Sequence, residues 1–251
     1  MVAAVFPAAG QGKRMRAGMN KVFLELAGLP ILVHTLRRFS QSTKIDYLVV
    51  VVAAEEVEEI RSLLRRIPHL KPFQVVAGST ERQYSIANGL AVLPEEAEIV
   101  LVHDAARPLV TVQTIDGVVK AAQETGGAVA AVPEKNTVKI ISSDGIVVKT
   151  PPRETLWEVQ TPQGFRRDLL LKAYQKAKEE NFLGTDDSSL VERLHVPIKV
   201  VESDYRNIKV TTPEDLIIAE ALIRAQGDLG GALREAAGYT KDWLKNKFHR
   251  K

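Results

Sequence analysis

The chain opens with the stretch VAAVFPAAGQGKRM, from Val2 to Met15, in which an apolar run leads directly into a glycine-containing loop. Continuous runs of Val and Ala are typical of parallel strands that helices cover on both faces. Further short apolar runs follow at Tyr47–Ala53, Phe73–Val76, Ile99–Val102, Ala128–Val132 and Ile198–Val201. We therefore expect Val2–Phe6 to be one strand of a mainly parallel sheet, with the loop at its carboxyl end, where open α/β sheets bind ligands.

Longer amphipathic stretches separate these runs and predict helices. They lie at Ile31–Phe39, with Pro30 as the first helical residue, and at Glu55–Arg66, Thr80–Leu93, Val112–Thr125, Arg166–Asn181 and Thr212–Ala225. Strands that alternate with helices in this way indicate an α/β fold of three layers.

The alternation stops at Thr137. Thr137–Ser142 and Ile146–Thr150 alternate β-branched and polar residues around Ser143-Asp144-Gly145, and Asp-Gly between two such runs is a strong hairpin signal. We expect residues 136–154 to form an inserted β-hairpin arm. Such an arm either reaches a partner subunit or remains a plain surface hairpin, and the sequence leaves both open.

Composition restricts the class of protein. The 251 residues include no Cys and carry a formal net charge of +3, so we expect no disulfide framework and no nucleic-acid-binding surface. No apolar run approaches the roughly 20 residues of a membrane span. These features predict a cytoplasmic protein without a membrane anchor.

The opening loop fits neither common nucleotide-binding motif. A dinucleotide fingerprint needs a third glycine where this chain has Met15, and a Walker loop needs Gly-Lys-Ser/Thr. The loop does bring the cations Lys13, Arg14 and Lys21 close together, and backbone amides freed by Gly10 can cradle phosphates. The stretch therefore predicts a polyphosphate-binding loop.

Other strand ends carry polar clusters as well. HDAARP places Asp104 where it either binds Mg²⁺ or caps the next turn, and Arg107 where it can meet a phosphate. The stretch AGSTERQYS provides either backbone contacts to a ligand or an ordinary helix cap. Lys209 either contacts a ligand or is a solvated lysine. Clusters at one edge of a single sheet predict a shared site.

The glycine-rich residues 227–231 interrupt the helical pattern and divide the chain. We expect a catalytic domain over residues 1–227 and a basic helical extension over 228–251. In this extension, the candidates to pack on the domain are Trp243, Leu244 and Phe248. The lysines of the extension face either solvent or an acidic partner.

Six motifs together carry a family resemblance. PAAGQGKRM, GSTER, HDAARP, TPQGF, TDDSSLVE and NIKVTTPEDL occur in the order seen in the 2-C-methyl-D-erythritol 4-phosphate cytidylyltransferases, which the chain resembles from Val2 to Ala225. The ribitol-5-phosphate cytidylyltransferases share near versions, but PAAG and HDAARP favour the erythritol family.

The resemblance implies a Rossmann-like nucleotidyltransferase fold, a homodimer joined through the arm, and Mg²⁺-dependent transfer of CMP from CTP to methylerythritol phosphate with release of pyrophosphate. Catalytic roles are implied for Arg14 and Lys21, and metal binding for Asp104. Nucleotide binding is implied for Pro7, Ala8, Ala9, Gly10, Gly12, Gly78, Ser79, Thr80 and Ser85. Substrate binding is implied for Arg107, Thr137, Arg153, Thr161, Thr185, Lys209 and Thr211.

The chain departs from the family pattern at Asn20, where a proline is usual, and at Ser79, where a glycine is usual. Three alternatives stay open from the sequence: another polyol-phosphate nucleotidyltransferase, a dinucleotide-dependent oxidoreductase and a non-catalytic nucleotide-binding regulator. The absent third glycine counts against the oxidoreductase, and the retained Lys21 and Asp104 count against the regulator.

Overall fold

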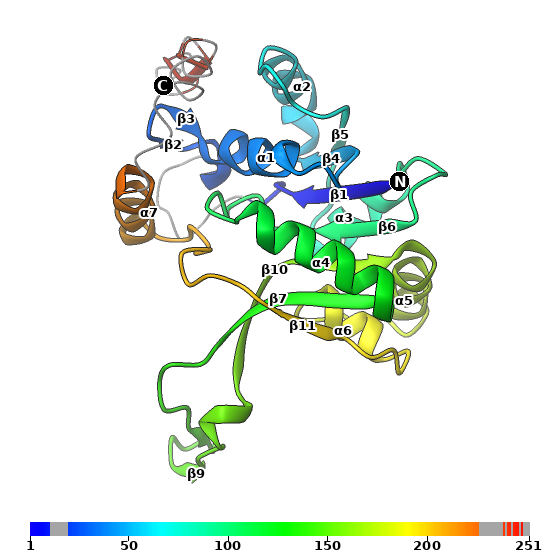
Figure 1. Ribbon diagram of the computed structural model, residues 1–251, viewed down its shortest axis with the longest axis vertical. Coiled ribbons are helices and arrows are strands. Elements are labelled where there is room, and N and C mark those ends of the chain that lie inside the picture. The colour runs from blue at the N-terminus through cyan, green and yellow to red at the C-terminus, as the bar shows by residue number, and fades with distance from the viewer. Residues whose placement is uncertain (11–19, 226–237, 239, 242, 246, 248–251) are drawn as a thin grey trace.

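A seven-stranded sheet forms the centre of the protein in a computed structural model (Figure 1). The structure describes residues 1–10 and 20–225 and, beyond these, residues 238, 240, 241, 243–245 and 247. The strands follow the order β11-β7-β10-β6-β1-β4-β5. Their bounds are β1 (Val2–Pro7), β4 (Tyr47–Val52), β5 (Phe73–Ala77), β6 (Ile99–Val102), β7 (Gly127–Pro133), β10 (Trp157–Arg166) and β11 (Lys199–Glu202). Only β10 runs antiparallel to its neighbours in this sheet, which confirms the expected mainly parallel arrangement.

Helices cover both faces of the sheet and make three layers. One face carries α1 (Ile31–Gln41), α2 (Val57–Arg65) and α4 (Val112–Thr125), and the other carries α3 (Arg82–Leu90), α5 (Arg167–Glu179) and α6 (Asp187–Glu192). In β1, Ala4 and Phe6 pack in the first of these cores while Ala3 and Val5 pack in the second. Because successive strand side chains point to opposite faces and both faces are buried, the strand reads as one continuous apolar run.

The predicted strands of the central sheet and most of the predicted helices appear within two residues of their expected bounds. Among the helices that are shorter than predicted, α3 covers only Arg82–Leu90, and the stretch predicted from Glu55 divides into a 3-10 turn, Ala54–Glu56, and α2. Pro30 is a correction, because it pairs in the short strand β3 (Leu29–Pro30) and caps α1 without being its first residue.

Among the elements that the sequence-based prediction missed are β10 and α6. The strand β10 reads WEVQTPQGFR and buries Gln160, Thr161 and Gln163, so it lacks the apolar run that marked the other strands. Hydrogen bonds satisfy these polar groups instead: Gln163 donates to Asp186 at 2.7 Å, and Asn207 donates to Gln160 at 2.9 Å. Burial of paired polar groups explains why an apolar pattern did not reveal the strand.

A smaller apolar cluster joins the last helix to the start of the chain. The helix α7 (Pro213–Ala225) contributes Ala219 and Ile223, which pack with Leu26 of the short strand β2 (Glu25–Leu26). The same cluster includes Leu109 and Val210. It therefore brings the segment after the opening loop, the loop after β6 and the segment before α7 to one end of the molecule.

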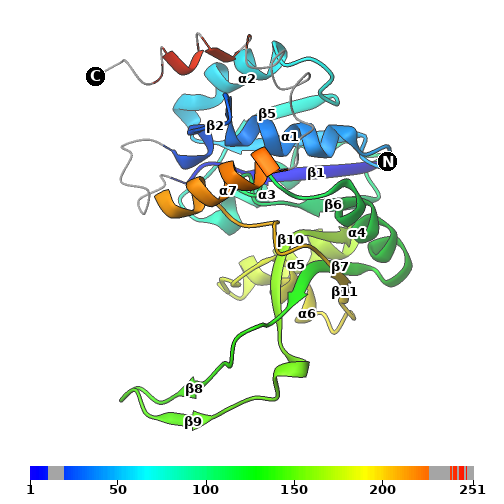
Figure 2. The same ribbon diagram turned by 60° about the vertical axis from the view of Figure 1, so that its left-hand side comes forward.

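The predicted arm is present and projects away from the sheet (Figures 1 and 2). Its strands β8 (Ile140–Ile141) and β9 (Val147–Lys149) are shorter than expected, and Gly145 occupies the turn between them with φ of +77°. Ile141, Ile146 and Val148 are 59%, 67% and 66% exposed. Among the described residues, no helix combines the length and the apolar character needed to cross a membrane.

Candidate active site

A pocket of about 220 Å³ lies at the carboxyl ends of β1, β5 and β6. This is the edge at which open α/β sheets bind ligands. Its lining comes from five separate parts of the chain: Pro7, Ala8, Ala9, Gly10, Asn20, Lys21, Val22, Ser79, Thr80, Glu81, Arg82, Ser85, Asp104, Ala105, Ala106 and Lys209. The polar clusters that the sequence placed at separate strand ends therefore meet in one site.

Close backbone packing shapes the wall formed by the ends of β1 and β5. The amide of Ala8 donates to Val51 O at 2.6 Å, and the amide of Gly78 donates to Val52 O at 2.7 Å. A Cβ at position 78 would lie 2.6 Å from the Cβ of Ala9 and 2.9 Å from Ser85 Oγ. Only glycine fits there, so Gly78 lets the two strand ends approach each other.

Ser85 holds the neighbouring turn in place. Its hydroxyl accepts a hydrogen bond from the Ser79 amide at 2.9 Å and donates one to Ser79 O at 3.1 Å. Both bonds join the turn to the first turn of α3, so the turn keeps its shape without a ligand. The residue at position 79 takes part through its backbone alone, which explains how serine replaces the usual glycine.

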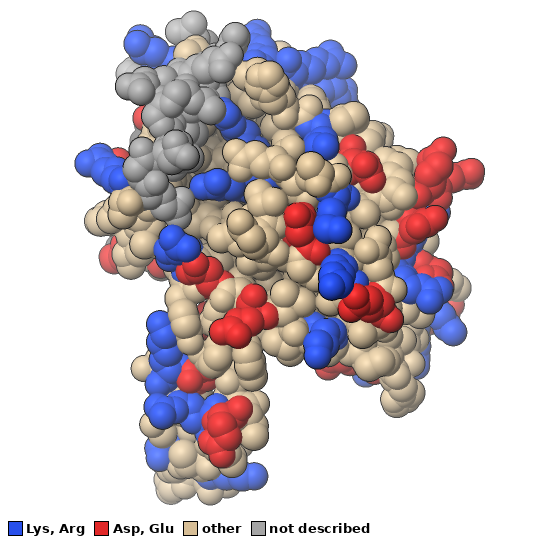
Figure 3. Space-filling view, viewed as in Figure 1, with Lys and Arg blue, Asp and Glu red and all other residues tan. Residues whose placement is uncertain are grey.

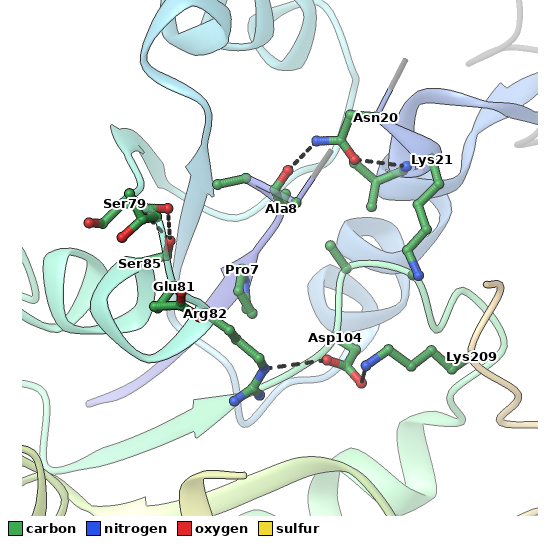
Figure 4. A pocket seen from close by; sticks show the side chains of 16 residues that line it. Pro7, Ala8, Asn20, Lys21, Ser79, Glu81, Arg82, Ser85, Asp104 and Lys209 are labelled. Carbon is green, nitrogen blue, oxygen red and sulfur yellow. Dashed lines mark hydrogen bonds and ion pairs between the residues drawn. The ribbon is translucent and has the colours of Figure 1, made fainter. Parts of the chain in front are cut away.

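Asp104 is the electrostatic centre of the pocket. Arg82 and Lys209 approach it from opposite sides in Figure 4. Lys209 Nζ lies 2.9 Å and Arg107 Nε 3.3 Å from Oδ2, and Arg82 Nε lies 3.9 Å from Oδ1. Burial raises the pKa of the Asp104 carboxyl, but these three cations outweigh burial and hold that pKa well below its ordinary range. Asp104 is therefore a carboxylate throughout the physiological pH range.

A hydrogen-bond chain behind Asp104 fixes its backbone. The Asp104 amide donates to Thr161 Oγ1 at 3.0 Å, and Thr161 Oγ1 lies 3.1 Å from His103 Nδ1. His103 Nε2 lies 3.2 Å from Arg107 O, which can only accept, so Nε2 carries the proton and Nδ1 accepts from Thr161. Burial lowers the pKa of His103 to about 3, so the imidazole is neutral.

Arg82 is a site residue to which the sequence analysis assigned no role. It lines the pocket, and its guanidinium also lies 2.8 Å from the buried Asp187 carboxylate, which accepts a bond from Tyr174 OH at 2.5 Å. Burial opposes the charged form, yet Asp187 and Asp104 raise the pKa of Arg82 above its ordinary range. The contact between the GSTER motif, which holds Arg82, and the TDDSSLVE motif, which holds Asp187, could not be predicted from sequence spacing. Both carboxylates that Arg82 meets, Asp187 and Asp104, are far from it in the sequence.

Lys21 enters the pocket from the opposite wall. It begins a 3-10 turn, Lys21–Phe23, and its ammonium donates to Val210 O at 2.9 Å. Asn20 caps this turn: its side-chain oxygen accepts from the Val22 amide at 3.4 Å, and its side-chain amide donates to Ala8 O. Asn20 therefore links the end of β1 to the turn that carries Lys21 (Figure 4).

The other site residues that the resemblance implies fall into three groups: some lie beside the pocket, some lie away from it, and some lie outside the described residues. Arg107 reaches Asp104 and donates to Asn207 O at 2.7 Å, while Thr161 is buried behind the pocket wall. Thr211 donates to Asp215 at 2.7 Å. Thr185 is exposed before α6. Thr137 and Arg153 lie at the base of the arm, and Gly12 and Arg14 lie outside the described residues.

Among the described residues, no group of three or more acidic or histidine side chains is arranged to hold a metal ion. Among the residues that the structure describes, none donates a hydrogen bond to Asp104 Oδ1. The site thus offers one carboxylate oxygen to a metal. That suits Mg²⁺, which is usually held by one or two carboxylates together with the phosphates of a substrate.

Similarity to known proteins identifies the family. The family model of the 2-C-methyl-D-erythritol 4-phosphate cytidylyltransferases (IspD) matches residues 2–225. An enzyme of that name from Caldanaerobacter subterraneus subsp. tengcongensis is 46% identical over 224 residues, 89% of this chain and 99% of its own. One from Halalkalibacterium halodurans is 49% identical over 219 residues, 87% of this chain and 95% of its own.

Solved structures give the same result. The crystal structure of the 4-diphosphocytidyl-2C-methyl-D-erythritol synthase of Anaerococcus prevotii superimposes with a TM-score of 0.80 at 33% identity, covering 89% of this chain and 98% of that one. The enzyme from Thermus thermophilus gives 0.71 at 31% identity, covering 88% and 98%. This chain belongs to the 2-C-methyl-D-erythritol 4-phosphate cytidylyltransferase family.

Proposed function

We propose that the protein transfers CMP from CTP to 2-C-methyl-D-erythritol 4-phosphate, giving 4-diphosphocytidyl-2-C-methylerythritol and pyrophosphate in the non-mevalonate isoprenoid pathway. One observation carries this proposal: a single pocket brings together the PAAG backbone, the Ser79–Ser85 turn, Asp104 and the cations Lys21, Arg82 and Lys209. A pocket rich in cations suits two anionic reactants, and family membership supplies their identity.

The reaction would be an in-line displacement at phosphorus. A phosphate oxygen of methylerythritol phosphate attacks the α-phosphorus of CTP, the bond from that phosphorus to the bridging oxygen breaks, and pyrophosphate leaves with the electron pair. Because the attacking phosphate is already an anion, no protein nucleophile or base is required. Catalysis then depends on positioning the two phosphates and stabilising their charge.

The position of Lys21 in the pocket supports a role in stabilising that charge. Its bond to Val210 O directs the ammonium toward the side of the pocket that Asp104 and Lys209 occupy. We assign to Lys21, together with Arg14, the neutralisation of charge on the α-phosphate and the leaving group. Lys209 and Arg107, which both contact the Asp104 carboxylate, are assigned to the phosphate of the polyol substrate.

Asp104 would hold Mg²⁺ through Oδ1, together with phosphate oxygens of CTP. When bound, the ion would offset the repulsion between two anionic reactants. Asp104 itself keeps Lys209, Arg107 and Arg82 in position, because its buried carboxylate is their common partner. The acid therefore orders the cationic groups of the site in addition to its role as a metal ligand.

Cytosine is assigned to the wall between Ala8 and Ser85. Backbone groups of Pro7 to Gly10 and of Gly78 to Thr80 line or support this part of the pocket. A backbone carbonyl accepts a hydrogen bond from the exocyclic amine of cytosine, whereas uracil presents a carbonyl at the same place. Sites built to bind such a group discriminate strongly against the analogue that lacks it.

We also propose that the protein is a homodimer in which each arm reaches the partner's site. The arm exposes apolar side chains at its tip, and Lys and Arg side chains line its edge (Figure 3). Thr137 and Arg153 belong to this projecting arm, and neither of them lines the pocket of its own chain. A second copy would allow these two residues to contribute to substrate binding.

The direct test is release of pyrophosphate from CTP and Mg²⁺ with either methylerythritol phosphate or ribitol 5-phosphate. We expect release with the first polyol, little with the second, little when UTP replaces CTP, and loss of activity with EDTA. Release with ribitol phosphate alone would favour the related polyol-phosphate enzyme. No release with either polyol would contradict the proposal.

A further inference from the structure

We call residues 238, 240, 241, 243–245 and 247 the C-terminal segment, and they lie beyond the part of the chain that matches the family. Its described residues are helical and lie at the end of the molecule that carries β2, β3 and α2 (Figures 1 and 2). Thr240 and Leu244 are buried, Trp243 and Lys247 are half-buried, and Lys241 and Lys245 are exposed. The positions 240, 243, 244 and 247 share one face of a helix, so the segment docks through an amphipathic face.

This face contacts three separate parts of the catalytic domain. Thr240 Oγ1 donates to Gly28 O at 3.3 Å in the turn between β2 and β3. The Trp243 ring packs edge-on against Phe23, with centroids 5.8 Å apart. Lys247 Nζ forms an ion pair with Glu59 of α2 at 2.9 Å. The segment therefore contacts the β2–β3 turn, the 3-10 turn that holds Phe23, and α2 at the same time.

Phe23 is the contact that matters for the site, because it belongs to the same three-residue turn as Lys21. The Leu24 amide donates to Lys21 O and the Phe23 amide to Asn20 O, both at 3.1 Å. A turn this short does not persist without tertiary packing. Phe23 is fully buried, and Trp243 covers it, so the docked segment supports the backbone from which the Lys21 side chain extends.

A second connection passes through Lys247. Its ammonium lies 5.0 Å from the Phe23 ring centroid and 5.6 Å from that of Trp243, so the cation contacts both aromatic rings. Burial raises the pKa of the nearby Glu56, and Lys247 and the Asn20 side chain both counteract that rise. Glu56 is thus close to the docked segment on one side and to the cap of the Lys21 turn on the other.

We propose that the C-terminal segment is a positioning element for Lys21, with Trp243 and Lys247 as its positioning residues. The proposal rests on the assignment of Lys21 as a catalytic cation. Because misplacement by about 1 Å can lower a rate about 100-fold, loss of this support would slow the chemical step. It would leave the binding of methylerythritol phosphate, which is assigned to Lys209, unchanged.

The test is a double-mutant cycle on the full-length protein, with kcat and KM for both substrates. We expect Trp243→Ala to lower kcat by roughly 10-fold or more while the KM for methylerythritol phosphate stays within about twofold. In a Lys21→Ala background the same substitution should have no further effect, because residues that act through one group are not additive. The exposed Lys241→Ala is the matched control and should retain wild-type kinetics.

Trp243→Phe tests whether ring packing is the cause. The indole N–H of Trp243 is buried without a hydrogen-bond partner among the described residues, so Phe removes no bond and should restore most of the activity. If Trp243→Ala does not fold, Lys247→Ala is used in its place, with an expected loss of about threefold that is absent in the Lys21→Ala background.

Two results would overturn the proposal: wild-type kcat in a folded Trp243→Ala variant, or the same fold-loss in both backgrounds. Failure of the underlying assignment has a different signature, since Lys21→Ala alone would then be active. A purely structural role would lower the melting temperature in both backgrounds without the dependence of kcat on Lys21.

Discussion

The ammonium of Lys21 donates a hydrogen bond of 2.9 Å to the carbonyl oxygen of Val210, 189 positions further along the chain. The Val210 amide in turn donates to Ala106 O at 2.8 Å. The turn that follows the opening loop, the loop after β6 and the last motif are therefore joined through one backbone segment. Lys209 precedes Val210 and reaches Asp104, so the bond sets the spacing between Lys21 and Lys209.

Replacement of Lys21 by Ala should lower turnover by about 10²–10³, by analogy with the loss of one group that stabilises a developing charge. The same is expected of Arg14→Ala. Steady-state pyrophosphate release measures the effect, and Lys120→Ala on the exposed face of α4 is the control for loss of a positive charge. Turnover of Lys21→Ala within threefold of wild type would remove Lys21 from the mechanism.

The stability of the fold should decrease as the pH falls below 6.5, because of His103. Burial lowers the pKa of His103 to about 3 in the folded protein, while the unfolded chain takes up the proton near 6.5. Between these values the unfolded state binds more protons, so the free energy of unfolding rises with pH. From pH 7 to pH 5 this one group should remove about 2 kcal/mol.

Urea unfolding of the wild type and of His103→Gln at pH 5, 6, 7 and 8 measures this dependence. The variant lacks the titrating imidazole, so the difference between the two stabilities should be largest at pH 7–8 and shrink toward pH 5. Parallel curves for the two proteins would show that His103 is not neutral in the folded state.

The pattern of apolar residues along the chain predicted the elements whose buried positions are filled by apolar side chains. The parallel strands were evident because both faces are buried, and α4 matched its expected bounds because Thr111 caps it and Gly126, with φ of +90°, ends it. In contrast, the apolar pattern did not predict β10, because its buried positions are filled by hydrogen-bonded Gln and Thr. No local pattern encodes a strand whose polar side chains find their partners in distant segments.

The site was predictable at the level of motifs but not of pairings. Glycine and charge at strand ends predicted a shared site for Asp104, Lys21 and Lys209, and all three line the pocket. The roles of Arg82 and Asp187 depend on how the α3 and α6 helices approach the sheet, which a spacing pattern does not contain. The docking of Trp243 was an open expectation, and Phe248 lies outside the described residues.

The arm should determine the oligomeric state. Ile141 and Val148 are exposed on it, and acidic residues there would be incompatible with an apolar contact between subunits. We expect light scattering to show a dimer for the wild type and a monomer with reduced turnover for the double variant Ile141→Asp, Val148→Asp. Ile217→Asp changes an apolar residue that is 69% exposed on α7 and should remain dimeric. A wild-type monomer at micromolar concentration would contradict the shared site.

Asn20 should be replaceable by proline but not by alanine. Its φ of −64° is the value that proline imposes, so Asn20→Pro retains the backbone direction into the Lys21 turn. Asn20→Ala has no such constraint, and it also loses the bonds to Ala8 O and the Val22 amide, leaving a buried acceptor at the end of β1 without its donor. We expect kcat to fall about 10-fold in Asn20→Ala and less than about threefold in Asn20→Pro.

The comparison of the two Asn20 variants also separates two explanations of the departure from the family pattern. If both variants lose the same activity, the side-chain bonds position Lys21 and the backbone angle does not. If Asn20→Pro alone retains activity, the asparagine and the usual proline are two solutions to one requirement, a rigid backbone before Lys21. Melting temperatures of both variants distinguish a misplaced Lys21 from a general loss of stability, because only the former lowers kcat in a protein that remains folded.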